Sequence, residues 1–260
     1  MTNETPVVLY AVEASVATLT LSRPEKRNAL NEAMIEQLKS SLRKANDDSA
    51  IYAIIITGAG KDFCSGADLS ALQKIADGSV DANAEDARSL LELFTLIRAV
   101  TVPVIAAVRG RALAGGCGLA SACDLVLAST GARFGYPEVK IGFVPAMVTA
   151  ILRRNVSEKR AFELLTRGSE IDAQTAQEFG LVNQVFAEEN FDAEVRAYAS
   201  RFEKLSRSAV GLTKTLLYQI DGLAFPEALA AGADTNVIAR LTDDCRKGID
   251  RFLEKKSDAP

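Results

Sequence analysis

Two short, almost wholly apolar runs, at residues 51–57 and 104–108, are each followed by a glycine-rich stretch. An apolar run of this length without alternation is typical of a β-strand buried on both faces, as in a parallel sheet covered by helices. Helical periodicity occurs at residues 34–45, where Asn31 is placed to cap the first turn, and at residues 87–100. The sequence therefore predicts an α/β fold around a central sheet.

The rest of the chain divides into a core and a helical end. Residues 7–10 and 16–21 predict a β-hairpin, and residues 125–128 predict a third buried strand. Beyond residue 209 only helical patterns follow, so we expect a core over residues 1–204 and a helical region over residues 205–260. The remaining patterns predict helices at 159–166, 173–179, 192–205, 226–239 and 242–256, and a short strand at 181–186.

Histidine is absent from all 260 residues. This excludes a Ser-His-Asp triad, a Cys-His pair and every metal site that uses histidine, so acid–base chemistry falls to Asp, Glu, Lys, Tyr or Cys. The four cysteines, at positions 64, 117, 123 and 245, form no CxxC pair, which argues against a zinc ribbon. We therefore expect no metal site.

The charge and the first residues narrow the class of partner. A net charge of −4 argues against nucleic acid as a partner, because binding its phosphates needs a basic surface. An anionic small molecule is still a possible ligand, because local dipoles can outweigh the net charge. No apolar run reaches the roughly 18 residues that a membrane span needs. Residues 1–6 have neither a basic nor an apolar stretch, so we expect no signal peptide, reduced cysteines and a cytoplasmic location.

The first glycine-rich segment, residues 58–69, leaves the carboxyl end of a buried strand. Ligands of open α/β sheets gather at such ends, and small residues at 65–67 would let a ligand approach the backbone. Asp68 is placed to cap a following helix. The segment matches neither a Walker A loop nor GxGxxG, and it is also consistent with an ordinary strand-to-helix turn.

The second glycine-rich segment, residues 109–120, follows the other buried strand. Three of its glycines, at 115, 116 and 118, stand at the start of a predicted helix, where free backbone N–H groups and the helix dipole favour a negative oxygen. Close packing of the helix on the sheet is the other explanation. If N–H groups from both segments converge on one oxygen, they would stabilise an enolate or a tetrahedral oxyanion, and a thioester carbonyl is a suitable occupant.

Glu138 is the candidate acid–base group. It stands between Pro137 and an apolar run at residues 139–144, where partial desolvation would raise its pKa toward a catalytic range. A surface glutamate that starts a turn is the alternative interpretation.

Together these segments resemble the enoyl-CoA hydratase/isomerase (crotonase) superfamily over nearly the whole chain. The matching residues are 23–24 with 28–30 for its N-terminal signature, 63–69 for its first oxyanion and CoA loop, 114–117 with 122–124 for its second, 134–138 for the strand that carries a catalytic glutamate, and 249–255 for its final helix.

The resemblance implies an α/β spiral of ββα units with a C-terminal helical trimerisation region, assembled as a homotrimer or a dimer of trimers. It implies an acyl-CoA thioester substrate, with coenzyme A as part of the substrate and no separate cofactor. Glu138 would be catalytic, with the N–H groups of Ala67 and Gly115 as oxyanion donors. The implied CoA-binding residues are Ser65, Gly66, Ala67, Asp68, Leu69, Gly115 and Gly116, with Phe252 and Lys255 of a neighbouring subunit over the nucleotide.

One departure from the family pattern bears on the reaction. Typical hydratases carry two glutamates, and this chain has Gly118 at the first position and Glu138 at the second. Some hydratases of branched, carboxylated enoyl-CoAs look similar here. Our leading hypothesis is an enoyl-CoA hydratase that uses one glutamate. A Δ3,Δ2-enoyl-CoA isomerase, which relies mainly on the second glutamate, and a non-catalytic acyl-CoA-binding relative are the alternatives.

Overall fold

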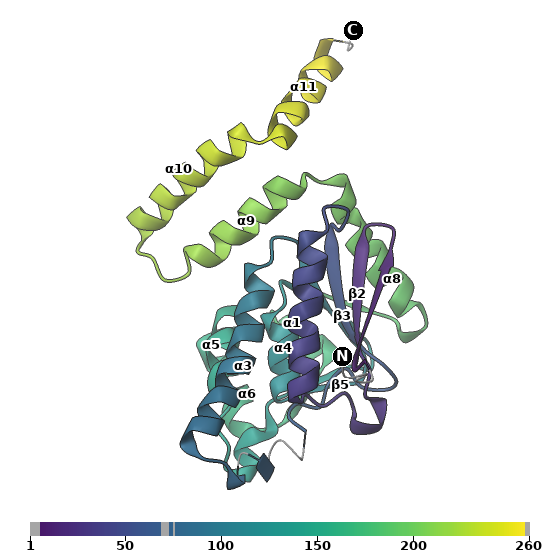
Figure 1. Cartoon of the computed structure of the whole chain (residues 1–260), viewed down its shortest axis with the longest axis vertical. Helices are drawn as coiled ribbons and strands as arrows, with labels where there is room; N and C mark the ends of the chain where they lie inside the picture. The colour runs from purple at the N-terminus through teal and green to yellow at the C-terminus, as the bar shows by residue number, and fades with distance from the viewer. Residues whose placement is uncertain (1–5, 69–72, 75, 258–260) are drawn as a thin grey trace, which may run out of the picture.

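The computed structural model describes residues 6–68, 73–74 and 76–257, without the side chains of residues 255–257 (Figure 1). A six-stranded sheet forms the centre of the core. Its first two strands pair antiparallel as the predicted hairpin, and every other neighbouring pair is parallel. The strands, in their order across the sheet, are β1 (Val8–Glu13), β2 (Val16–Leu21), β3 (Ala53–Gly58), β4 (Val104–Val108), β6 (Leu125–Ser129) and β9 (Gln184–Phe186).

Successive residues of the parallel strands face two separate hydrophobic cores. In β3, Ile54 and Ile56 enter the larger core, whereas Ile55 enters the smaller one. Helices α1 (Glu32–Asp47), α3 (Val80–Ala99) and α4 (Gly115–Ala122) cover the larger core, and α8 (Phe191–Ser200) covers the smaller one. Helices on both faces explain why the two apolar runs show no alternation.

A second, three-stranded sheet lies beside the first. It is formed by β5 (Arg111–Leu113), β7 (Arg133–Gly135) and β8 (Glu170–Asp172). A strand of the large sheet, a short strand of the small sheet and a helix therefore follow one another, as in β4, β5 and α4. This is the α/β spiral of ββα units that the family resemblance implied. The resemblance also placed a strand at residues 134–138, which overlaps β7, whereas β5 and β8 were not predicted.

The helix boundaries agree with the sequence patterns except where a helix lacks a stripe of apolar residues along one face. Asn31 caps α1, accepting a hydrogen bond from the Met34 N–H at 3.0 Å, as predicted. Helix α3 begins at Val80, seven residues before the predicted start, because Ser79 caps it and its first turns are exposed and carry no apolar stripe. The remaining core helices are α5 (Ala146–Asn155), which was not predicted, α6 (Glu158–Arg167) and α7 (Ala173–Glu178), with 3₁₀ turns η1 (Pro24–Lys26), η2 (Pro137–Ile141), η3 (Glu188–Asn190) and η4 (Arg201–Lys204).

Three helices close the chain: α9 (Arg207–Gln219), α10 (Phe225–Leu241) and α11 (Asp243–Ser257). Helix α9 packs against the core, whereas α10 and α11 extend away from it (Figure 1). No residue of α10 is buried, and its apolar side chains face solvent, with Phe225 79% exposed. Among the described residues, no helix combines the length and apolar character needed to cross a membrane.

Candidate active site

Ala67 lies on a short bridge between two loops. Leu30 pairs with it in parallel fashion: the Leu30 N–H donates to the Gly66 carbonyl at 2.7 Å, and the Asp68 N–H donates to the Leu30 carbonyl at 3.0 Å. In such a pairing the N–H of the middle residue points away from the partner strand. The Ala67 N–H has no partner among the hydrogen bonds of the described residues, and Ala67 is exposed. It is therefore available to an external acceptor.

An ion pair and a buried amide hold this loop in place. Arg23 Nη2 lies 2.7 Å from Asp68 Oδ2, and Arg23 Nη1 donates to the Ala29 carbonyl. The fully buried Asn28 donates to the carbonyls of Ala59 and Asp62 and accepts from the Arg23 N–H. The sequence placed Arg23 and Asn28 in a signature but assigned them no role. The residues directly after Asp68, where it was predicted to cap a helix, lie outside the described part of the chain.

The second loop ends in the first turn of α4. Ala114 has a φ of 50°, which is rare for a residue with a side chain, and its N–H donates to the Gly135 carbonyl at 2.9 Å. The bond from the Gly118 N–H to the Ala114 carbonyl is the first within the helix. The N–H groups of Gly115 and Gly116 therefore precede the helical ladder, and neither has a partner among the described residues.

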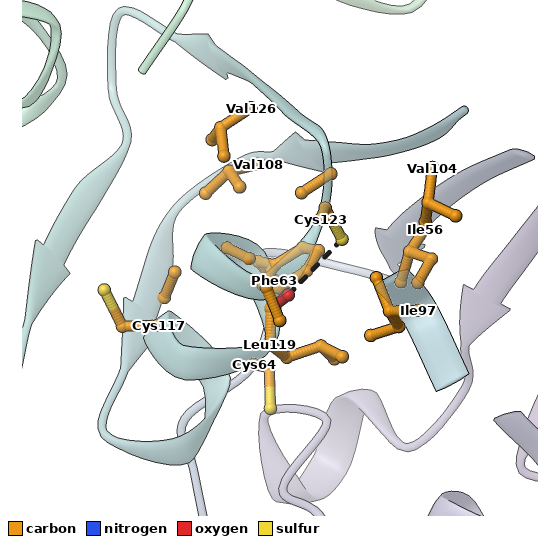
Figure 2. Packing of buried hydrophobic residues seen from close by; sticks show 14 of the residues in the cluster. Ile56, Phe63, Cys64, Ile97, Val104, Val108, Cys117, Leu119, Cys123 and Val126 are labelled. Carbon is orange, nitrogen blue, oxygen red and sulfur yellow. Dashed lines mark hydrogen bonds between the residues drawn. The ribbon is translucent and has the colours of Figure 1, made fainter. Parts of the chain in front are cut away.

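The two loops meet at their glycines. A Cβ on Gly66 would lie 2.7 Å from the Ala114 Cβ and 3.3 Å from the Gly115 nitrogen. A Cβ on Gly116 would overlap the Cys64 carbonyl. Gly66 also has a φ of 94°, which favours glycine. The glycines thus bring the turn before Ala67 against the start of α4. Figure 2 shows Phe63 and Cys64 of the first loop beside Cys117 and Leu119 of α4.

Glu138 lies just after β7, a strand of the three-stranded sheet. The sequence comparison put it on a strand, but β7 ends at Gly135 and Glu138 lies in the 3₁₀ turn η2. The turn forms because Pro137 fixes φ and removes a donor. Glu138 is half-buried, its Oε2 has no hydrogen-bond partner among the described residues, and burial raises the pKa of its carboxyl. The apolar residues that follow are themselves partly or largely exposed, with Ile141 at 70%.

A buried polar cluster joins α4 to the segment before Glu138. The Tyr136 hydroxyl lies 2.9 Å from Ser121 Oγ, and Ser121 Oγ donates to the Cys117 carbonyl at 2.7 Å. Burial raises the pKa of the Cys117 thiol to about 11, and the charge of Glu138 adds to this. Cys117 is therefore no thiolate near neutral pH, and it lies close enough to Glu138 to feel its charge.

Phe252 and Lys255, which were expected to contact coenzyme A from a neighbouring subunit, lie on α11 in this chain. Phe252 lies on α11, in the helical arm away from the core, where it is largely exposed (Figure 1). Lys255 follows on the same helix, with its side chain outside the described part. Leu69 also lies outside the described residues. Of the predicted site residues, the structure thus groups Ser65, Gly66, Ala67 and Asp68 with Gly115 and Gly116.

Known proteins resemble this chain in sequence and in fold. A family model described as enoyl-CoA hydratase/isomerase matches residues 11–259. A putative enoyl-CoA hydratase of Thermus thermophilus is 39% identical over 241 residues, covering 93% of this chain and 95% of the relative. The 2,3-dehydroadipyl-CoA hydratase of Escherichia coli is 37% identical, covering 96% of each. A crystal structure of enoyl-CoA hydratase from Mycobacterium smegmatis superposes with a TM-score of 0.91 at 33% identity, covering 96% of this chain and 97% of that one.

The chain therefore belongs to the enoyl-CoA hydratase/isomerase family and has the α/β crotonase fold with C-terminal helices. Membership implies an acyl-CoA substrate.

Proposed function

We propose that the protein adds water to a 2-enoyl-CoA thioester, with Glu138 as its one general acid–base group. The N–H groups of Ala67 and Gly115 hold the thioester oxygen, and Ser65–Asp68 with Gly116 line the path of coenzyme A. A branched acyl chain is compatible with this assignment. The observation that carries the proposal is the pair of unpartnered amides on two loops that their glycines bring into contact.

The reaction runs through an enolate. The Glu138 carboxylate accepts a proton from water as the water oxygen bonds to C3, and the C2=C3 electron pair moves toward the thioester oxygen. The two N–H groups stabilise the negative charge that develops there. Glu138 then returns the proton to C2, so that one molecule of water has been added. A carboxyl whose pKa is raised by burial holds that proton more readily than an ordinary glutamate.

One observation favours a Δ3,Δ2-enoyl-CoA isomerase as the second candidate. Gly118 offers no second carboxylate to orient a water molecule, and a lone Glu138 is sufficient to carry a proton from C2 to C4. Incubation with a 2-enoyl-CoA and, separately, a 3-enoyl-CoA distinguishes the two reactions. A hydroxyacyl product from the 2-enoyl ester supports the hydratase, whereas a shifted double bond without any hydroxy product supports the isomerase.

The decisive variant is Glu138→Gln. We expect it to bind a saturated acyl-CoA like the wild type but to lose about 10²–10⁴-fold in kcat on a 2-enoyl-CoA, the usual contribution of a positioned acid–base group. Glu158→Gln, on the exposed surface of α6, is the matched control and should keep full turnover. Wild-type turnover by Glu138→Gln would refute the assigned role.

We also propose that residues 205–260 assemble the chain as a homotrimer or a dimer of trimers. The uncovered apolar side chains of α10 support this, because such surface is normally buried between subunits. In that assembly Phe252 and Lys255 would reach a neighbour's coenzyme A. Light scattering after size exclusion measures the mass. A cytoplasmic location remains a prediction.

A further inference from the structure

Gly118 is a glycine because of a contact and not because of its backbone. It lies within the regular helix α4, whose backbone conformation any L-residue adopts. A Cβ at this position would overlap Cγ1 of Val148 and would lie 3.4 Å from Cζ of Phe94. Both neighbours are buried members of the larger core. The space into which a side chain at position 118 would project is therefore already occupied.

The helix that carries Val148 is held close to α4. Asn155, at the end of α5, donates from Nδ2 to the Ser121 carbonyl of α4 at 2.8 Å. Ile151 and Leu152 of α5 are buried in the same core. Interiors of this density accept an added methyl group only by strain. Helix α5 therefore cannot move away to admit a side chain at Gly118 without losing these contacts.

Neighbours of position 118 on α4 interact with the segment that carries the proposed acid. The charge of Glu138 contributes to the raised pKa of the thiol of Cys117, the residue before Gly118. Ser121, one turn further along α4, contacts Tyr136, two residues before Glu138. A carboxylate carried by residue 118 would thus start from the turn of α4 that holds these two contacts, on the side where Val148 and Phe94 now lie.

We propose that Val148 is a specificity-determining residue. Its side chain fills, with apolar volume, the space that a second acid on α4 would need, and so keeps Glu138 as the single carboxylate of the site. The assignment rests on the proposed function, because it concerns which acids act on the enoyl ester. It predicts that substitutions at Gly118 and Val148 are coupled in their effects on stability, and that neither side chain can be enlarged alone.

A double-mutant cycle measures the coupling without any substrate. We expect Gly118→Ala to lower the unfolding midpoint by about 5 °C or more, from overpacking in a chain of this size. In a Val148→Ala background the same change should add little. Leu152→Ala, which opens space elsewhere on α5, is the matched control and should not rescue Gly118→Ala. Equal loss of stability in all backgrounds, or none in Gly118→Ala itself, overturns the proposal.

A second experiment tests the effect on catalysis by introducing a second acid at position 118. Gly118→Glu in the Val148→Ala background should fold, hydrate a 2-enoyl-CoA at least about tenfold faster than Val148→Ala, and add an ionisation to the pH profile of kcat/KM. A folded double variant with an unchanged rate and profile overturns the specificity role. If the wild type turns over neither a 2-enoyl nor a 3-enoyl ester, the proposed function fails, whereas the stability cycle still decides whether Val148 occupies the space.

Discussion

The buried Lys214 of α9 lies 2.7 Å from the partly buried Asp124, which precedes β6, and this ion pair fastens the helical end of the chain to the core. Lys214 also donates to the carbonyl of Ile97, in the last turn of α3, and to that of Val102, in the connection between α3 and β4. Tyr218, one turn later, donates to the other oxygen of Asp124 at 2.6 Å. Burial lowers the pKa of Lys214, and Asp124 opposes that shift.

Removal of the lysine should therefore be costly. Lys214→Met leaves the Asp124 carboxylate without its buried countercharge, and the loss of one partner of such a pair costs about 3–5 kcal/mol. Urea unfolding of the purified variant measures the loss. Lys159→Met, at an exposed position of α6, serves as the control and should change stability by less than about 0.5 kcal/mol. A loss in Lys214→Met no larger than the control would show that the pair does not anchor α9.

The Arg23–Asp68 ion pair predicts a defect in turnover. Arg23→Gln frees the loop that carries the Ala67 amide, so the amide should be less well aimed at the thioester oxygen. We expect kcat to fall about tenfold, a fraction of the loss seen when an oxyanion donor is removed, with a smaller change in KM. Steady-state kinetics on a 2-enoyl-CoA measure both constants.

A matched variant separates positioning from charge. Arg88→Gln removes the same charge from an exposed part of α3 and should leave both constants unchanged. If Arg23→Gln retains wild-type kcat while its fold is intact, the ion pair does not position Ala67.

The raised pKa of Glu138 predicts a pH-dependent stability. Because its folded-state pKa lies above the unfolded value, the protonated form is favoured on folding. The contribution of the Glu138 carboxyl to stability is fully present below its pKa in the unfolded state. This contribution is lost as the pH rises through its pKa in the folded state. Glu138→Gln, which cannot ionise, should thus be more stable than the wild type at pH 8. The advantage should shrink toward zero near pH 4. Thermal melts at both values test the sign, and an advantage that grows on acidification would contradict it.

The uncovered face of α10 predicts a change in assembly. Leu229→Glu places a charge among exposed apolar side chains and should convert oligomers into single chains, because a buried unpaired charge is strongly unfavourable at an interface. Asp234→Asn on the same helix is the control and should keep the wild-type mass. Light scattering gives the mass, and circular dichroism should show unchanged helix content. A wild type that is already a single chain at micromolar concentration would refute the prediction.

Local sequence patterns were sufficient where burial leaves a continuous apolar run or a helical period with a recognisable cap. The run at residues 104–108 became β4 with the predicted bounds, and Asn31 caps α1 as expected. Strands β5, β7 and β8 have three residues each, too few for any period to be recognised, and they form because neighbouring strands complete their hydrogen bonds. The first turns of α3 carry no apolar stripe, so no pattern marked them.

In the candidate site, too, some features could be predicted from the sequence and others depend on the tertiary structure. The sequence marked the small residues at Gly66 and Gly115 as places where a ligand can approach the backbone, and it marked Glu138 as one candidate among the acid–base groups left without histidine. The oxyanion roles proposed for Ala67 and Gly115 came from the family resemblance. Only the tertiary structure decided that Gly66 meets the start of α4, that Arg23 and Asn28 hold the Ala67 loop, and that Val148 fills the space beside Gly118. These relationships join residues far apart in the chain, and packing between distant segments leaves no trace in the order of residues along either one.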